Sequence, residues 1–232
     1  MPIDPTQPAL EPHTQQFVDG LAGALPIYTL SPVDARTVLE RVQSAPVGKP
    51  SAQIEDIAFP VGPTGSVPLR IVRPVGTTEV LPVVLYFHGG GWILGGRDTH
   101  DRLVREIAVG AAAAVVFVDY ARAPEARYPV AIEQAYAATR YVVDQSASLR
   151  IDPLRLAVAG DSVGGNMAAA VTLMARQRRG PHAISDYGSA QRWEDMAAAR
   201  KSRTRLHSIL LCGTAARGMR CIRGGDDRRP AR

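Results

Sequence analysis

The 232-residue sequence predicts an α/β fold in which helices pack on both faces of a mainly parallel, doubly wound sheet. Short apolar runs alternate with helical segments between residues 81 and 178, as in repeated strand–helix units. These runs are continuously apolar, which is typical of parallel strands buried on both faces. Because ligands bind at the carboxyl ends of such strands, functional residues are expected directly after them.

Residues 1–50 form an N-terminal segment with two short amphipathic helices. The first runs through residues 15–22. The second begins at Ser31-Pro32, where serine suits the N-cap and proline the first helical position, and it continues to Val42. Two roles fit this pair: docking against the core, or forming a lid over a substrate pocket.

The core is expected over residues 51–180 and begins with a hairpin. Its two alternating runs lie within residues 53–74 and are joined by glycines at 62 and 65. Three buried strands and three helices then alternate along the chain, without internal repeats. The strands are expected at residues 81–87, 113–119 and 154–159, and the helices at residues 98–108, 129–145 and 164–178.

Ser162 lies where the last of these strands meets its helix, at Gly160-Asp161-Ser162-Val163-Gly164. A G-x-S-x-G sequence in this setting is typical of a nucleophile elbow. Its glycines let the strand and helix backbones pass closely, and the serine hydroxyl stands above the sheet edge. The alternative is an ordinary glycine-rich turn with a serine that takes no part in chemistry.

A second glycine-rich site, His88-Gly89-Gly90-Gly91-Trp92, follows the strand at residues 81–87. Three glycines leave backbone N–H groups unobstructed, so that two can converge on a negatively charged oxygen; the alternative is a flexible turn. A dinucleotide-binding site does not fit, because the pattern G-x-G-x-x-G is absent from these glycine-rich stretches. A P-loop does not fit either, because the sequence contains no G-x-x-x-x-G-K-[ST]. The two sites together predict acyl transfer, with Ser162 attacking an ester carbonyl.

With Asp119-Tyr120-Ala121-Arg122-Ala123-Pro124-Glu125, these two motifs resemble the hormone-sensitive-lipase-like family of α/β-hydrolase esterases. The resemblance covers roughly residues 50–180 and ends near Ile184. It implies that Ser162 is the nucleophile and that the N–H groups of Gly89, Gly90 and Val163 form the oxyanion hole. It also implies that His88 shapes the glycine loop and is not the general base. The remaining motif residues are Gly91, Gly160, Asp161 and Gly164.

The resemblance also implies a function and a substrate class. Members hydrolyse carboxylic esters, commonly with short or medium acyl chains, and use no metal and no organic cofactor. A small-molecule ester is therefore the expected substrate. In this family an N-terminal helical segment contributes to a cap, which favours the lid role for residues 1–50.

Residues 181–232 depart from the family as a basic, irregular tail, and the C-terminal part of the fold is expected to be missing. The catalytic acid and base should follow the nucleophile in the chain. Residues 206–212 are the single apolar run in this tail, and we hypothesise that a frameshift or truncation replaced an ancestral end. Candidate acids and bases without a recognisable motif are Asp186, Asp195, Asp226, Asp227, His182 and His207.

Two functions therefore stay open. One is an esterase whose acid and base come from the tail or from a partner chain. The other is a catalytically inactive α/β-hydrolase that lacks both groups. Homo-oligomer formation also stays open.

The net charge of +5 is distributed unevenly. The first 175 residues hold 13 Lys and Arg against 17 Asp and Glu, a net charge of −4, and the remainder holds 14 against 5, a net charge of +9. This basic tail has few interleaved aromatic residues, so no nucleic-acid partner is expected.

The sequence also lacks a membrane-length apolar run and a secretion signal, which predicts a cytoplasmic protein without a membrane span. Cys212 and Cys221 have no neighbours at metal-ligand spacing, so neither a zinc site nor a disulfide is expected.

Overall fold

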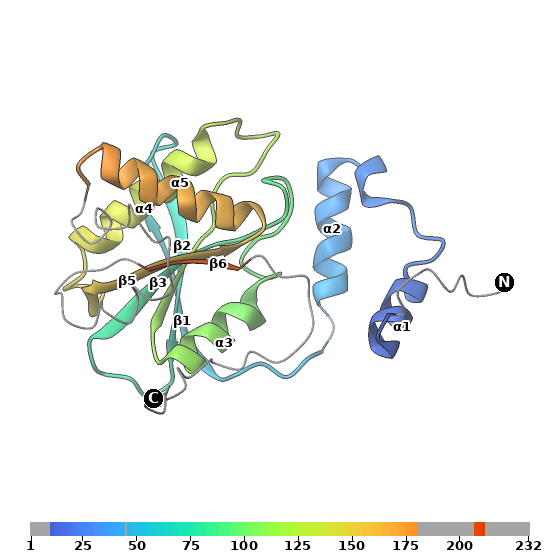
Figure 1. The fold of residues 1–232 in the computed structure, drawn as a ribbon, viewed down its shortest axis with the longest axis horizontal. Coiled ribbons are helices and arrows are strands. Elements are labelled where there is room, and N and C mark those ends of the chain that lie inside the picture. Colours follow the sequence, from blue (N-terminus) through green and yellow to red (C-terminus); the bar gives the residue numbers. More distant parts are fainter. Residues whose placement is uncertain (1–9, 45, 181–206, 212–232) are drawn as a thin grey trace, which may run out of the picture.

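A computed structural model describes residues 10–44, 46–180 and 207–211, the last of these as backbone only. Its centre is a six-stranded sheet in the order β1-β2-β4-β3-β5-β6 (Figure 1). The strands are β1 (Ala52–Phe59), β2 (Val67–Pro74), β3 (Leu81–Phe87), β4 (Ala114–Val118), β5 (Ile151–Asp161) and β6 (His207–Leu211). The helices are α1 (Pro12–Gly20), α2 (Pro32–Gln43), α3 (Asp101–Ala111), α4 (Val130–Asp144) and α5 (Val163–Gln177), with a 3-10 turn η1 (Ile27–Thr29).

The sheet is mainly parallel, as predicted. The hairpin strand β2 pairs antiparallel with β1 and with β4, whereas β3, β4, β5 and β6 run parallel to one another. Helix α3 covers one face and helices α4 and α5 cover the other (Figure 1). The carboxyl ends of β3 and β5 therefore meet at one edge of the sheet, which brings the two glycine-rich motifs together.

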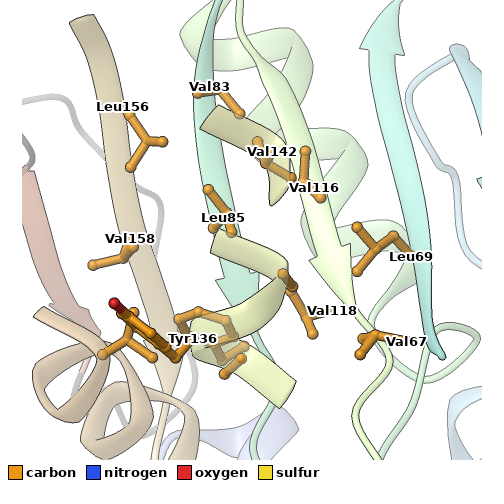
Figure 2. Close-up of a cluster of buried hydrophobic side chains, with 14 of the residues drawn as sticks. Val67, Leu69, Val83, Leu85, Val116, Val118, Tyr136, Val142, Leu156 and Val158 are labelled. Carbon is orange, nitrogen blue, oxygen red and sulfur yellow. The ribbon is translucent and has the colours of Figure 1, made fainter. Parts of the chain in front are cut away.

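Two apolar clusters fill the space between the sheet and its helices. The larger one lies beneath α4 and α5, where Leu85, Val116 and Val158 of three neighbouring strands are fully buried (Figure 2). The smaller one lies beneath α3, where Val104 packs with Phe117 and other residues of the opposite sheet face. Every residue of β4 is buried, which confirms the expectation from its continuous apolar run.

Element boundaries differ from the predicted ones where local hydrogen bonds compete. Helix α3 starts at Asp101 and not at residue 98, because the Thr99 hydroxyl bonds both the N–H and the carbonyl of Gly96 and so forms a turn ahead of the helix. Helix α2 begins as expected, since the Ser31 side chain accepts the N–H of Asp34 at 3.2 Å. Strand β5 starts at Ile151, three residues earlier than predicted.

Strand β6 is a regular element within residues 181–232, which were expected to form an irregular tail. It forms from the apolar run at residues 206–212 and pairs in parallel with β5, with His207 opposite Ala157 and Leu211 opposite Asp161. The strand that leads to Ser162 is therefore covered on its outer side. Residues 181–206 and 212–232 lie outside the described part of the chain.

The N-terminal helices pack loosely. Helix α1 buries none of its residues, and α2 buries only Ala35. Both lie beside the sheet and not on either of its faces (Figure 1). Within the residues that the structure describes, none of the helices combines the length and apolar character that crossing a bilayer requires.

Candidate active site

Ser162 is the N-cap residue of α5 and has a strained backbone, with φ of 53° and ψ of −119°. A non-glycine residue with positive φ costs roughly 1–3 kcal/mol and persists only where the surrounding structure enforces it. Here the side chain stays exposed between the end of β5 and the start of α5. This is the strand–turn–helix geometry expected of a nucleophile elbow.

The two flanking glycines are required by close packing of backbones. A Cβ atom on Gly164 would lie 2.7 Å from the carbonyl carbon of Phe87 and 2.9 Å from the carbonyl oxygen of His88. A Cβ atom on Gly160 would lie 2.5 Å from the Phe87 oxygen. Both positions therefore pack against the end of β3, which fixes the elbow beside the glycine loop.

Asp161 links the elbow to the glycine loop. Its Oδ1 atom accepts hydrogen bonds from the Tyr86 hydroxyl at 2.8 Å and from the Gly89 N–H at 2.9 Å, and it lies 3.5 Å from His100 Nε2. Partial burial acts to raise the pKa of Asp161. The interactions with His100, Tyr86 and the Gly89 N–H outweigh burial and lower this pKa to about 2. Asp161 is therefore an anion at neutral pH.

The Gly89 N–H, expected as an oxyanion donor, already donates to Asp161 in this structure. The N–H groups of Gly90 and Gly91 make no hydrogen bond within the described part of the chain. Both residues have positive φ, of 109° and 66°, and the Gly90 carbonyl accepts the N–H groups of Ile93 and Leu94 in a tight turn. Gly91 is exposed and Gly90 is half-buried, so solvent can reach this turn.

Val163 offers a third N–H group near the elbow. It is the first residue of α5, and N–H groups in the first helical turn have no acceptor within the helix. A helix N-terminus also carries partial positive charge, which favours a developing anion.

His88 lies fully buried behind the loop. Its ring stacks on Tyr120 with centroids 4.1 Å apart, and its Nδ1 lies 2.8 Å from the Gly89 carbonyl oxygen. The Tyr120 hydroxyl donates to the His88 carbonyl at 2.8 Å. Burial lowers the pKa of His88 to about 4, so the ring is neutral at pH 7. This arrangement fits a residue that shapes the loop.

The loop that follows β4 braces the glycine loop from the other side. The Ala123 N–H donates to the Trp92 carbonyl at 2.8 Å, and the Arg122 guanidinium donates to the Gly95 carbonyl. Arg97 Nε donates to Asp119 at 2.9 Å. The third sequence motif thus has a structural task, which is to hold the segment after Gly91.

Strand register argues against His207 as the general base. Its backbone lies opposite Ala157, five residues before Ser162. At roughly 3.3 Å per residue this places the His207 backbone about 16 Å from the elbow along the strand. The other candidate base and acids lie outside the described residues: His182, Asp186, Asp195, Asp226 and Asp227.

Sequence reasoning missed three residues that organise this site. Tyr86, His100 and Arg36 stand outside the sequence motifs. Tyr86 and His100 contact the Asp161 carboxylate, and Arg36 contacts the Ile93 carbonyl next to the glycine loop. Among the described residues, no group of three or more His, Cys, Asp and Glu side chains is arranged to hold a metal ion.

Comparison with known proteins agrees with this geometry. A family model described as the alpha/beta hydrolase fold matches residues 84–228. Carboxylesterase NlhH of Mycobacterium tuberculosis is 46% identical over 147 residues, covering 63% of this chain and 46% of that protein. Esterase LipI of the same organism is 41% identical over 179 residues, covering 75% of this chain and 54% of that protein.

A solved structure of a thermostable esterase from Pseudomonas putida is also similar. It superposes with a TM-score of 0.72 at 44% sequence identity, covering 75% of this chain and 56% of that one. The chain therefore spans about half the length of the relatives it matches. Fold, motifs and similarity agree, and the chain belongs to the hormone-sensitive-lipase-like family of the α/β-hydrolase fold.

Proposed function

We propose that this chain carries the nucleophile and oxyanion hole of a carboxylic ester hydrolase. The observation that supports this most is the strained, exposed Ser162 beside a glycine loop with two N–H groups that have no hydrogen-bond acceptor among the described residues. The Ser162 oxygen forms a bond to the ester carbonyl carbon, and the alcohol leaves with the proton that the serine gives up. Water then hydrolyses the acyl-serine and releases the acid.

The oxyanion donors in this proposal are the N–H groups of Gly90, Gly91 and Val163. Each would act only on the tetrahedral intermediate, where negative charge develops on the carbonyl oxygen. Losing one such donor typically costs about 10²- to 10³-fold in kcat. Gly89 has a different part: its N–H fixes the loop to Asp161.

The catalytic acid and base would come from outside the described residues or from a partner chain. Without a base, a serine hydroxyl is a weak nucleophile at neutral pH. An oxyanion hole and substrate binding alone still accelerate hydrolysis about 10³- to 10⁴-fold relative to the reaction in water. If the chain lacks the acid and base, we therefore expect it to hydrolyse esters much more slowly than a complete site would.

The substrate class proposed is a small carboxylic ester, and no metal or organic cofactor is needed for this chemistry. Two relatives are named as a carboxylesterase and an esterase, which supports this class. The N-terminal helices α1 and α2 are proposed as part of a cap above the site, with residues 51–180 as the catalytic core.

Hydrolysis of p-nitrophenyl acetate tests this proposal. Initial rates would be compared between the chain and its Ser162→Ala variant, after circular dichroism has shown that both are folded. Turnover that falls sharply in the variant, toward the residual rate of an oxyanion hole without a nucleophile, supports the esterase. Equal rates in both proteins would contradict it and support the inactive alternative.

A further inference from the structure

Arg36 of α2 joins the N-terminal helices to two loops of the site. Its Nε donates to the Ile93 carbonyl at 2.7 Å, and its Nη2 donates to the Ala123 carbonyl at 2.7 Å. Both terminal nitrogens bond the Glu125 carboxylate at 2.8 Å. One guanidinium thus makes four hydrogen bonds to residues 57 to 89 positions away in sequence, and its side chain is only 14% exposed.

Among the described residues, little else attaches α2 to the core. Only Ala35 of this helix is buried, whereas Val33, Val38 and Val42 remain exposed. Within the described residues, Arg36 makes all the side-chain hydrogen bonds between α2 and the rest of the fold. The position of α2 beside the site (Figure 1) therefore depends largely on one side chain.

The carbonyls that Arg36 binds belong to the frame of the glycine loop. Ile93 donates its N–H to the Gly90 carbonyl at 3.1 Å, and Ala123 donates its N–H to the Trp92 carbonyl at 2.8 Å. Arg36 therefore contacts the turn that presents the Gly90 and Gly91 N–H groups at Ile93, and the neighbouring loop after β4 at Ala123. Moving its guanidinium would release that turn on two sides.

We propose that Arg36 is a positioning residue that couples the N-terminal helices to the oxyanion loop. The coupling to the oxyanion loop, which is measured by kinetics, rests on the proposed function. The attachment of α2 to the core does not. A planar guanidinium suits this task because it binds a carboxylate and two carbonyls at once, whereas a lysine ammonium cannot reproduce that geometry. The hydrogen bonds from Arg36 also lower the pKa of Glu125 to about 2, so this carboxylate remains charged in mildly acidic solution.

Limited proteolysis tests the attachment without requiring activity. Arg36→Ala and Arg36→Lys would be digested with thermolysin beside Arg41→Ala, a control on the same helix whose arginine is exposed. Intact-mass spectrometry would follow release of the segment before residue 51. We expect release several-fold faster in Arg36→Ala, an intermediate rate in Arg36→Lys and no change in the control. Unchanged release in Arg36→Ala would overturn the proposal.

Kinetics with p-nitrophenyl acetate test the coupling. A misplaced oxyanion loop weakens an interaction made only in the transition state, so kcat should fall about 10- to 100-fold while KM changes less than about twofold. A rise in KM with unchanged kcat would refute coupling to the loop. An inactive parent chain would refute the proposed function instead, and proteolysis would still decide the attachment. If Arg36→Ala does not fold, Glu125→Gln provides the milder variant, with the same expected directions.

Discussion

Replacing Gly164 with alanine should destabilise the fold by forcing the elbow away from β3. The added Cβ would meet three backbone atoms, the carbonyl carbon and oxygen of Phe87 and the carbonyl oxygen of His88. None of these can move as the end of a flexible side chain can. The steric overlap can therefore be relieved only if α5 shifts relative to β3.

The magnitude follows from two opposing effects. Overpacking of a well-packed site typically costs about 1–3 kcal/mol, and backbone neighbours place Gly164 near the upper end. Alanine recovers roughly 0.5–1 kcal/mol through its better helix propensity. The net loss is about 2 kcal/mol, which for a chain of this size lowers Tm by roughly 4–8 °C.

Thermal unfolding followed by circular dichroism would measure this, with Gly110→Ala as the matched control. Gly110 also lies in a helix, but a Cβ there meets nothing within 4 Å. The control should therefore gain about 0.5–1 kcal/mol and raise Tm by roughly 1–4 °C. A Gly164→Ala variant as stable as the parent would refute the close approach of α5 to β3.

Three further changes have defined outcomes. The folded-state pKa of Asp161 is lowered to about 2, so its ionised form contributes stability above its ordinary pKa of 3.8 that is lost as pH falls toward 2. Urea unfolding between pH 6 and pH 2.5 should show a shallower pH dependence in Asp161→Asn, and identical slopes would contradict this. Leu85→Ala should lower the free energy of unfolding by about 2–5 kcal/mol, because its side chain is fully buried in the larger cluster, and a urea titration with less than 1 kcal/mol of loss would count against that packing. Ala112→Gly should raise Tm, because Ala112 ends α3 with φ of 46°, a left-handed conformation that costs a non-glycine residue about 1–2 kcal/mol; a lower Tm would argue against this cap.

Much of the fold was predictable because its signals are local. The continuous apolar residues 81–87 coincide with β3, and the Ser31-Pro32 cap marks the start of α2. The turn at Ser162 could be recognised as an elbow candidate from its two flanking glycines. Such glycines are needed wherever strand and helix backbones pass closely at an elbow. In each case a few consecutive residues carry the physical cause.

Contacts between distant segments were not predictable in this way. The Gly89 N–H is taken by Asp161, 72 residues later, and the motif alone does not distinguish this donor from its neighbours Gly90 and Gly91. Arg36 has no local pattern, since its acceptors lie in loops far along the chain. Strand β6 was missed because its short apolar run stands among polar residues without an adjoining helical pattern.

Covalent trapping of the nucleophile would test directly whether Ser162 is activated at this elbow. Diethyl p-nitrophenyl phosphate would form a bond from the serine oxygen to phosphorus and release p-nitrophenol, and peptide mass spectrometry would locate the diethylphosphoryl group. We expect one modified residue, Ser162, and no modification in Ser162→Ala. Absence of labelling at Ser162, or equal labelling of other serines, would contradict an activated nucleophile at this elbow.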